Sequence, residues 1–209
     1  MERKSLKIAN IYSHLNGLEF LLVHKKNIWE EIQNIIENID AEVYRTKISN
    51  ERDRKGIKLF SPVDLNNSIK NSFYNLNWHE RRVSYCVTDD IDTSREIAQI
   101  TDRKTQKYII ESNGFNCYST YNQIDFVKDK IAVEVQFGKY FSVQYDLHVK
   151  HTFFYNRGDI DVGLEIIPTH KMMSQMSSGI AWYENELMNI IREGRSNPSV
   201  PIILLGIEP

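Results

Sequence analysis

One seven-residue segment limits the possible folds of this chain more than any other. Residues 131–137 read Ile-Ala-Val-Glu-Val-Gln-Phe, and so many β-branched residues favour a strand. Alternate side chains of a strand point to opposite faces, so Glu134 and Gln136 share one face. The opposite face is apolar and is expected in the core: Val133, Val135 and Phe137. Because a buried carboxylate is costly unless it is paired or binds a metal, this strand is a candidate for function.

A second short strand precedes this segment. Residues 124–127 read Ile-Asp-Phe-Val, and Lys-Asp-Lys at 128–130 is typical of a turn. A tight turn there would place Asp125 across from Glu134. Two carboxylates at close range raise each other's proton affinity, and a divalent cation relieves the repulsion. Hard oxygen ligands suit Mg²⁺, which acidifies a bound water and stabilises a reacting phosphate. The hairpin therefore predicts an Mg²⁺ site.

An ordinary edge hairpin is the alternative interpretation. In it, Asp125 belongs to the turn and Glu134 faces solvent. The spacing Asp-x8-Glu-x-Gln, taken by itself, favours this plainer interpretation.

Strands alternate with helices over the second half of the chain, which predicts an α/β fold with a central mixed sheet flanked by helices. Helices are expected at 140–155 and 179–193, and strands at 160–167 and 202–207. In the first half, helices are expected behind Asn27, behind Ser61 and over 101–113, with a strand at 82–87. The polar stretch 45–58 predicts an exposed loop or a mobile arm. The length of 209 residues suits a single domain over residues 1–209.

Composition excludes several classes of protein. The absence of a run of about 18 apolar residues predicts no membrane span, and the N-terminus lacks the apolar core of a signal peptide. Two cysteines, Cys86 and Cys117, are too few for a metal cluster or a disulfide framework, so we expect reduced, buried thiols in a cytoplasmic protein. The formal net charge of -2 argues weakly against a nucleic-acid binder, although the field at a cleft matters more than the total.

The hairpin resembles the motif of the PD-(D/E)XK nucleases, with Asp125 followed by Glu134-Val135-Gln136. The longer pattern Ile-Asp-Phe-x6-Val-Glu-Val-Gln-Phe is similar to the type II restriction endonucleases of the BglII/BstYI kind. The likeness to the BstYI type is the most extensive, and it is spread over nearly the whole chain. The segments that carry it are 12–19, 28–33, 121–123, 125–129, 134–140, 177–180 and 206–207.

This resemblance implies roles for individual residues. Asp125 and Glu134 would bind the metal, and the carbonyl of Val135 would be a third ligand. Gln136 stands where the wider superfamily usually has lysine; it can orient groups only by hydrogen bonds, so the base that activates water is left open. Glu111, 14 residues before Asp125 on a predicted helix, is either a further carboxylate of the metal site or a solvated glutamate.

The same resemblance implies a homodimer that cuts double-stranded DNA at a palindrome centred on GATC. A purine would precede this core, a pyrimidine would follow it, and cleavage before the first G would leave four-base 5′ overhangs. Lys139 and the hydroxyl groups of Ser177 and Ser178 are candidate base readers, and Arg192 and Arg195 are candidate DNA contacts. The plainer alternatives are phosphate contacts, a helix cap and a solvated face. Another nuclease on the same fold, or a DNA-binding protein without catalysis, would also fit.

Overall fold

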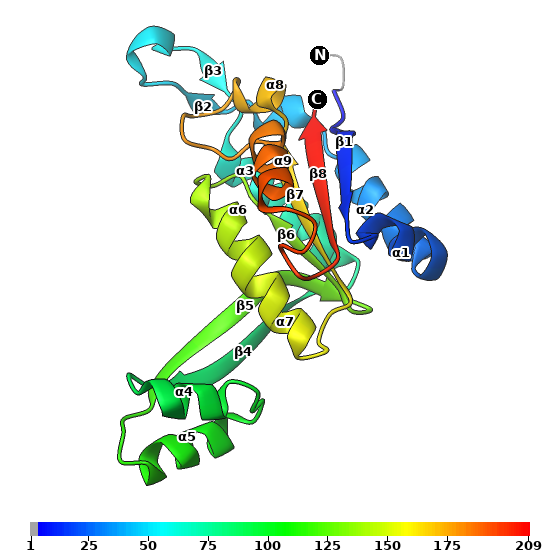
Figure 1. The fold of residues 1–209 in the computed structure, drawn as a ribbon. Helices are drawn as coiled ribbons and strands as arrows, with labels where there is room; N and C mark the ends of the chain where they lie inside the picture. Colours follow the sequence, from blue (N-terminus) through cyan, green and yellow to red (C-terminus); the bar gives the residue numbers. More distant parts are fainter. Residues whose placement is uncertain (1–3) are drawn as a thin grey trace. The chain divides into compact units, whose positions relative to one another are not determined.

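A mixed sheet of six strands organises the chain (Figure 1). In the computed structural model, which describes residues 4–209, the strand order is β1-β8-β7-β6-β5-β4. Strands β6, β7 and β8 are parallel neighbours, whereas β1 pairs with β8 and β5 pairs with β6 in antiparallel fashion. The strands are β1 (Lys7–His14), β4 (His79–Val87), β5 (Tyr118–Lys128), β6 (Ile131–Val135), β7 (Val162–Pro168) and β8 (Ile202–Glu208). The predicted α/β class with a central mixed sheet is confirmed.

The chain divides into two compact units. Unit 1 consists of residues 4–79 and Asp125–Pro209, and unit 2 consists of Glu80–Ile124. Unit 2 contains α4 (Ile91–Ile97) and α5 (Arg103–Ser112). The helices of unit 1 are α1 (Gly17–His24), α2 (Lys26–Glu37), α3 (Pro62–Asn75), α6 (Phe141–Tyr145), α7 (Thr152–Asn156), α8 (His170–Met173) and α9 (Tyr183–Glu193). Between residues 4 and 209, no helix has the length and apolar character needed to cross a membrane. The single domain over residues 1–209 stays a prediction.

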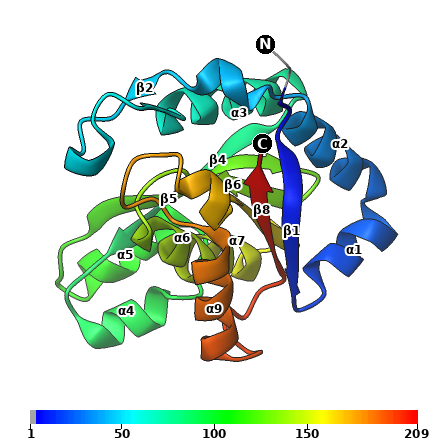
Figure 2. The ribbon, with the colours of Figure 1, turned by 90° about the horizontal axis from the view of Figure 1, so that it is seen from above.

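Helices cover both faces of the sheet in unit 1, as Figure 2 shows from above. On one face, Val133, Leu164 and Leu205 pack with apolar residues of α2 and α3. On the other face, Ile202 and Leu204 pack with residues of α6 and α9. Strands buried on both faces carry nearly continuous apolar sequence, which is why the apolar segment 202–207 was recognisable as a strand.

Most of the predicted elements are present with shifted ends. Ser61 caps α3 by accepting a hydrogen bond from the backbone N–H of Asp64 at 3.3 Å, and Gly114 follows α5 with φ +86°. The elements β1, α1, α4 and α8 were not predicted. The stretch 45–58 is not a plain loop, because β2 (Lys47–Ile48) and β3 (Lys58–Leu59) pair as a short hairpin.

The prediction of two reduced thiols is wrong for this structure. Cys86 at the end of β4 and Cys117 just before β5 are joined by a disulfide within unit 2, with their Cα atoms 5.5 Å apart. Neighbouring strands bring the two positions together although they are 31 residues apart in the chain. Sequence spacing alone could not reveal this pairing.

The start of α1 packs against β8 without space for a side chain. A Cβ atom at Gly17 would lie 2.9 Å from the carbonyl oxygen of Ile202, a backbone atom that cannot move alone. We expect Gly17→Ala to lower the free energy of unfolding by about 1–3 kcal/mol in urea titrations. Asn71→Ala, at an exposed position of α3, is the control and should change stability by less than about 0.5 kcal/mol. Equal stability of the two variants would contradict this close packing.

Candidate active site

The β5–β6 hairpin has the geometry that the sequence predicts. Its register pairs Phe126 with Val133, and extending this register by one residue pair places Asp125 opposite Glu134. Residues 129–130 form the turn with positive φ angles of 49° and 64°, as the two-residue turns of tight hairpins require.

Glu134 is buried, so the interpretation as an ordinary edge hairpin is wrong. Its relative exposure is 2%, and the side chains predicted for the apolar face of the strand are also buried: Val133, Val135 and Phe137. The parallel register of β6 and β7 places Glu165 beside Glu134, and Glu165 is fully buried as well. The side chains of Glu134 and Glu165 therefore lie next to each other on one face of the sheet, in the protein interior.

The segment 141–156 adds further charged groups to this face. It is helical throughout, with a π-helical stretch (Asp146–His151) between α6 and α7. The ammonium of Lys150 lies 3.0 Å from Oε1 of Glu134 and 2.7 Å from Oδ1 of Asp146. A π-helical turn inside an α-helix is frequent at functional sites. We call Asp125, Glu134, Asp146 and Lys150 the carboxylate cluster.

Gln136 is tied to this cluster through Asp146. Its Nε2 donates to Oδ2 of Asp146 at 3.2 Å, and its Oε1 accepts from the backbone N–H of Gly138 at 3.0 Å. A Cβ atom at Gly138 would lie 2.5 Å from this Oε1. Glycine at position 138 therefore permits the amide to turn back and hold one orientation.

Asp125 is the most accessible carboxylate of the cluster. Its side chain is 25% exposed, and Oδ2 lies 3.4 Å from the ammonium of Lys70, on α3. The backbone carbonyl of Val135 as a metal ligand stays a prediction.

Burial and like charges govern the electrostatics of the cluster. Burial raises the pKa of Glu134 well above its ordinary value, and the neighbouring carboxylates of Asp146 and Asp125 raise it further. The pKa of Asp146 is raised in the same direction, mainly by burial, while Lys150 acts to lower it. Burial also acts to lower the pKa of Lys150, but the carboxylates of Glu134 and Asp146 outweigh it and keep the ammonium charged.

A second buried pair lies beside the cluster. Nε2 of His151 is 3.0 Å from Oε1 of Glu165, and both side chains are fully buried. Burial raises the pKa of Glu165 and lowers the pKa of His151 to about 3, so both shifts favour the uncharged forms. Gly163 makes room for the imidazole, since a Cβ atom there would lie 2.6 Å from the ring.

The chemistry of the cluster fits a hard divalent cation. Within residues 4–209, no group of three or more His, Cys, Asp or Glu side chains already stands as a ready ligand set. However, the carboxylates of Glu134 and Asp146 converge on one cationic group, the ammonium of Lys150. Oxygen atoms that gather around a positive charge are the donor type that Mg²⁺ and related cations prefer.

The cluster is open to solvent on one side. A hollow of about 280 Å³ is lined by Gln136, Phe141, Ser142, Tyr145, Asp146 and Lys150. It gives a substrate a route to Gln136 and Lys150, whereas Glu165 and His151 remain enclosed.

Three of the predicted base readers come from adjoining segments. Lys139 is exposed, and its backbone forms a bridge with Ile180, which follows Ser177 and Ser178 in the same loop. Arg192 and Arg195 are also exposed, but they lie at and beyond the other end of α9, which spans roughly 16 Å.

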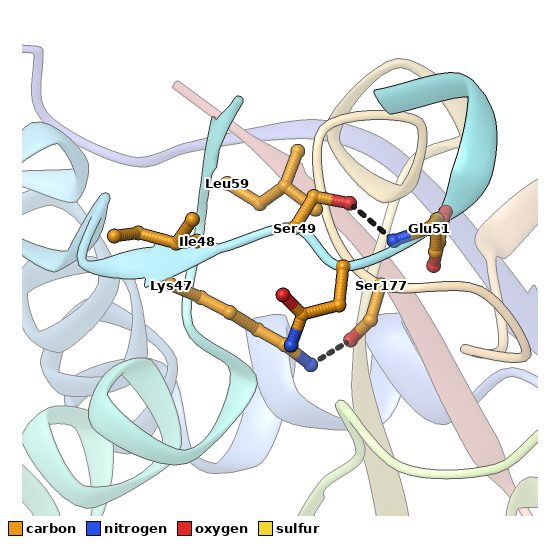
Figure 3. A pocket seen from close by; sticks show the side chains of 7 residues that line it. Lys47, Ile48, Ser49, Glu51, Leu59 and Ser177 are labelled. Carbon is orange, nitrogen blue, oxygen red and sulfur yellow. Dashed lines mark hydrogen bonds between the residues drawn. The ribbon is translucent and has the colours of Figure 1, made fainter. Parts of the chain in front are cut away.

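The polar hairpin β2–β3 holds the serine loop through contacts that the sequence did not suggest. A hollow of about 340 Å³ is lined by both segments. Nζ of Lys47 donates to Oγ of Ser177 there at 2.9 Å (Figure 3). Oε1 of Glu51 accepts from the backbone N–H of Ser178 at 2.9 Å. Hydrogen bonds from Ser178 and then Arg54 lower the pKa of Glu51 to about 2.

Glu111 lies on α5 in unit 2, with its carboxylate 3.5 Å from the ammonium of Lys107. Its proposed place near the metal stays a prediction.

Sequence reasoning missed Asp146, Lys150 and Glu165. Asp146 and Lys150 are four residues apart on a helix that the sequence did predict, so they had to share one face. The available signal was that this face also carries Val143 and Leu147, and is therefore turned to the core.

Comparisons with known proteins find a matching family and similar solved structures. Residues 9–207 match the family model described as "Restriction endonuclease BglII/BglIII". The chain is similar to the crystal structure of restriction endonuclease BglII complexed with a DNA 16-mer, at 20% identity and a TM-score of 0.64, covering 97% of this chain and 76% of that chain. It is also similar to free BglII, at 18% identity and a TM-score of 0.52, covering 97% and 79%. These two likenesses show the shared fold. No curated protein matches the chain in a sequence comparison.

The raised pKa of Glu134 predicts how stability depends on pH without metal. Its stabilising contribution is present below the ordinary value of 4.5 and is lost as the pH rises through the folded-state pKa. In EDTA at pH 8, we expect Glu134→Gln to unfold at a higher temperature than the unaltered protein, and this advantage to shrink toward pH 4.5. Glu37→Gln, at an exposed position, should show no such trend. Thermal melts across this range would refute the expectation if the unaltered protein were the more stable at pH 8.

Proposed function

Because the chain belongs to the restriction endonuclease BglII/BglIII family, and is thus a type II site-specific deoxyribonuclease, we propose that the carboxylate cluster is its Mg²⁺-dependent active site. The observation that carries this proposal is the buried Glu134, whose carboxyl group interacts electrostatically with the carboxylates of Asp146 and Asp125. Burial of adjacent acids opposes the stability of the metal-free protein, which is the pattern expected of groups retained for chemistry.

The residues of the cluster divide the work. Asp125, Glu134 and the carbonyl of Val135 would hold the cation, which when bound lowers the pKa of a water molecule and offsets charge on the phosphate. Gln136 would orient the water or the phosphate, since its amide is already held by Asp146 and Gly138. Glu111 remains a proposed additional carboxylate.

DNA recognition is proposed for the segments next to the cluster. Lys139 is exposed four residues after the end of β6, and lysine can donate to N7 and O6 of guanine. Ser177 and Ser178 can switch between donating and accepting, which suits a position where either purine is allowed. Arg192 and Arg195 would contact the backbone or the bases of the DNA.

We further propose a homodimer that acts in the cytoplasm on a six-base palindrome. A two-fold symmetric site is read by a two-fold symmetric protein, with one half-site and one strand for each subunit. The crystal structure of BglII with a DNA 16-mer supports DNA as the substrate.

Removal of a metal ligand should separate catalysis from binding. We expect Asp125→Asn and Glu134→Ala each to slow plasmid cleavage by at least about a hundredfold, because the charge that holds the metal is lost. DNA affinity, measured by gel shift in Ca²⁺, should stay within about threefold, because phosphate and base contacts lie elsewhere. Glu37→Ala is the control for loss of an exposed acid. Cleavage at the normal rate by either variant would refute the site.

The ends of digested DNA test the recognition sequence. We expect sequenced genomic fragments to begin with GATC as a four-base 5′ overhang, preceded by either purine. At each position of GATC, the correct base pair should be preferred over a wrong one by about 1–3 kcal/mol of binding free energy. Ends without GATC would contradict the specificity, a single fixed outer base would contradict only its degeneracy, and unselective fragments would indicate a nonspecific nuclease.

A further inference from the structure

Lys150 occupies the place where the carboxylates of the cluster meet. Its ammonium contacts Glu134 at 3.0 Å and Asp146 at 2.7 Å, and these carboxylate side chains are only 3% and 2% exposed. An ammonium has three donors, and two are engaged here. Without this contact, two buried acids would lie side by side with no positive partner, which is strongly unfavourable.

A divalent cation at Glu134 would lie close to this ammonium. If Oε1 of Glu134 binds the metal, the cation and the ammonium that now stands 3.0 Å from this oxygen would repel each other at close range. Lys150 and the cation are therefore alternative partners of the cluster. This step rests on the proposed function, because it takes Glu134 to be a metal ligand.

The displaced side chain has a place to go. Lys150 itself lines the open hollow, together with Gln136 and Tyr145, and its four-carbon stem can turn without movement of the helix. There the ammonium would face a bound substrate.

We propose that Lys150 holds Glu134 and Asp146 together in the metal-free protein, competes with the divalent cation for Glu134, and on displacement turns into the hollow to bind the scissile phosphate. Metal binding would thus move the ammonium of Lys150 toward the substrate.

The first experiment measures metal binding without DNA. Mn²⁺ is titrated into the metal-free protein, and the electron paramagnetic resonance signal of the free ion reports binding. We expect Lys150→Met to bind Mn²⁺ at least about tenfold more tightly than the unaltered protein, because a close opposing charge has been removed. Lys150→Arg should stay within about threefold, and Glu134→Gln should lose the binding. Unchanged or weaker binding by Lys150→Met overturns the competition.

Lys26→Met is the matched control. Lys26 also has a carboxylate four residues along its helix, Glu30 at 3.5 Å, but this pair is exposed. Its removal should leave Mn²⁺ binding unchanged. If thermal melts show that Lys150→Met is unfolded, Lys150→Gln replaces it, since the amide keeps a donor for the carboxylates and still lacks the charge.

The second experiment measures single-turnover cleavage at saturating Mg²⁺. We expect Lys150→Met to be slower by about a hundredfold, with Lys150→Arg intermediate. Equal rates would overturn the phosphate contact. If the unaltered protein cuts no DNA, the proposed function is refuted. If the unaltered protein cuts DNA but Lys150→Met binds Mn²⁺ no more tightly, only the role of Lys150 is refuted.

Discussion

The burial of acidic side chains between β6, β7 and the helical segment 141–156 is the constraint on which the rest of the structure depends. A buried ionised carboxylate requires a partner, because desolvation costs more than most other interactions return. Lys150 serves Glu134 and Asp146, and His151 lies beside Glu165. Three of these five side chains lie on the short π-helical stretch, namely Asp146, Lys150 and His151. Its backbone and the two strands must therefore keep their relative positions.

Packing on the opposite face of the sheet offsets the unfavourable free energy of burying these acidic side chains. Val133 and Val135 alternate with Glu134 on β6, and they pack with α2 and α3 in the larger core. The same strand thus contributes stability on one side and chemistry on the other. A site built on central strands is held more rigidly than one built on loops, which suits the positioning of a metal and a phosphate.

The sequence predicted the elements whose patterns are local. Periodic apolar residues revealed α3, a continuous apolar run revealed β8, and the alternation around Glu134 revealed the hairpin with Asp125. Partners across the sheet were beyond local patterns: the neighbour of Glu134 on β7 depends on a parallel register that no spacing specifies. Unit 2 showed the same limit, since the disulfide between Cys86 and Cys117 follows from strand pairing. Charged residues in a predicted helix, such as Lys150, look solvated until the opposing strand is known.

The contact between the polar hairpin and the serine loop joins residues 130 positions apart in the chain. Lys47 and Glu51 restrict Ser177 and Ser178 before any DNA arrives, so little disorder remains to be lost on binding. If the loop reads bases as proposed, discrimination is a joint property of two segments rather than of the loop alone. An attempt to redesign the base preference would then have to alter the hairpin and the loop together, and variation among natural relatives should couple these positions.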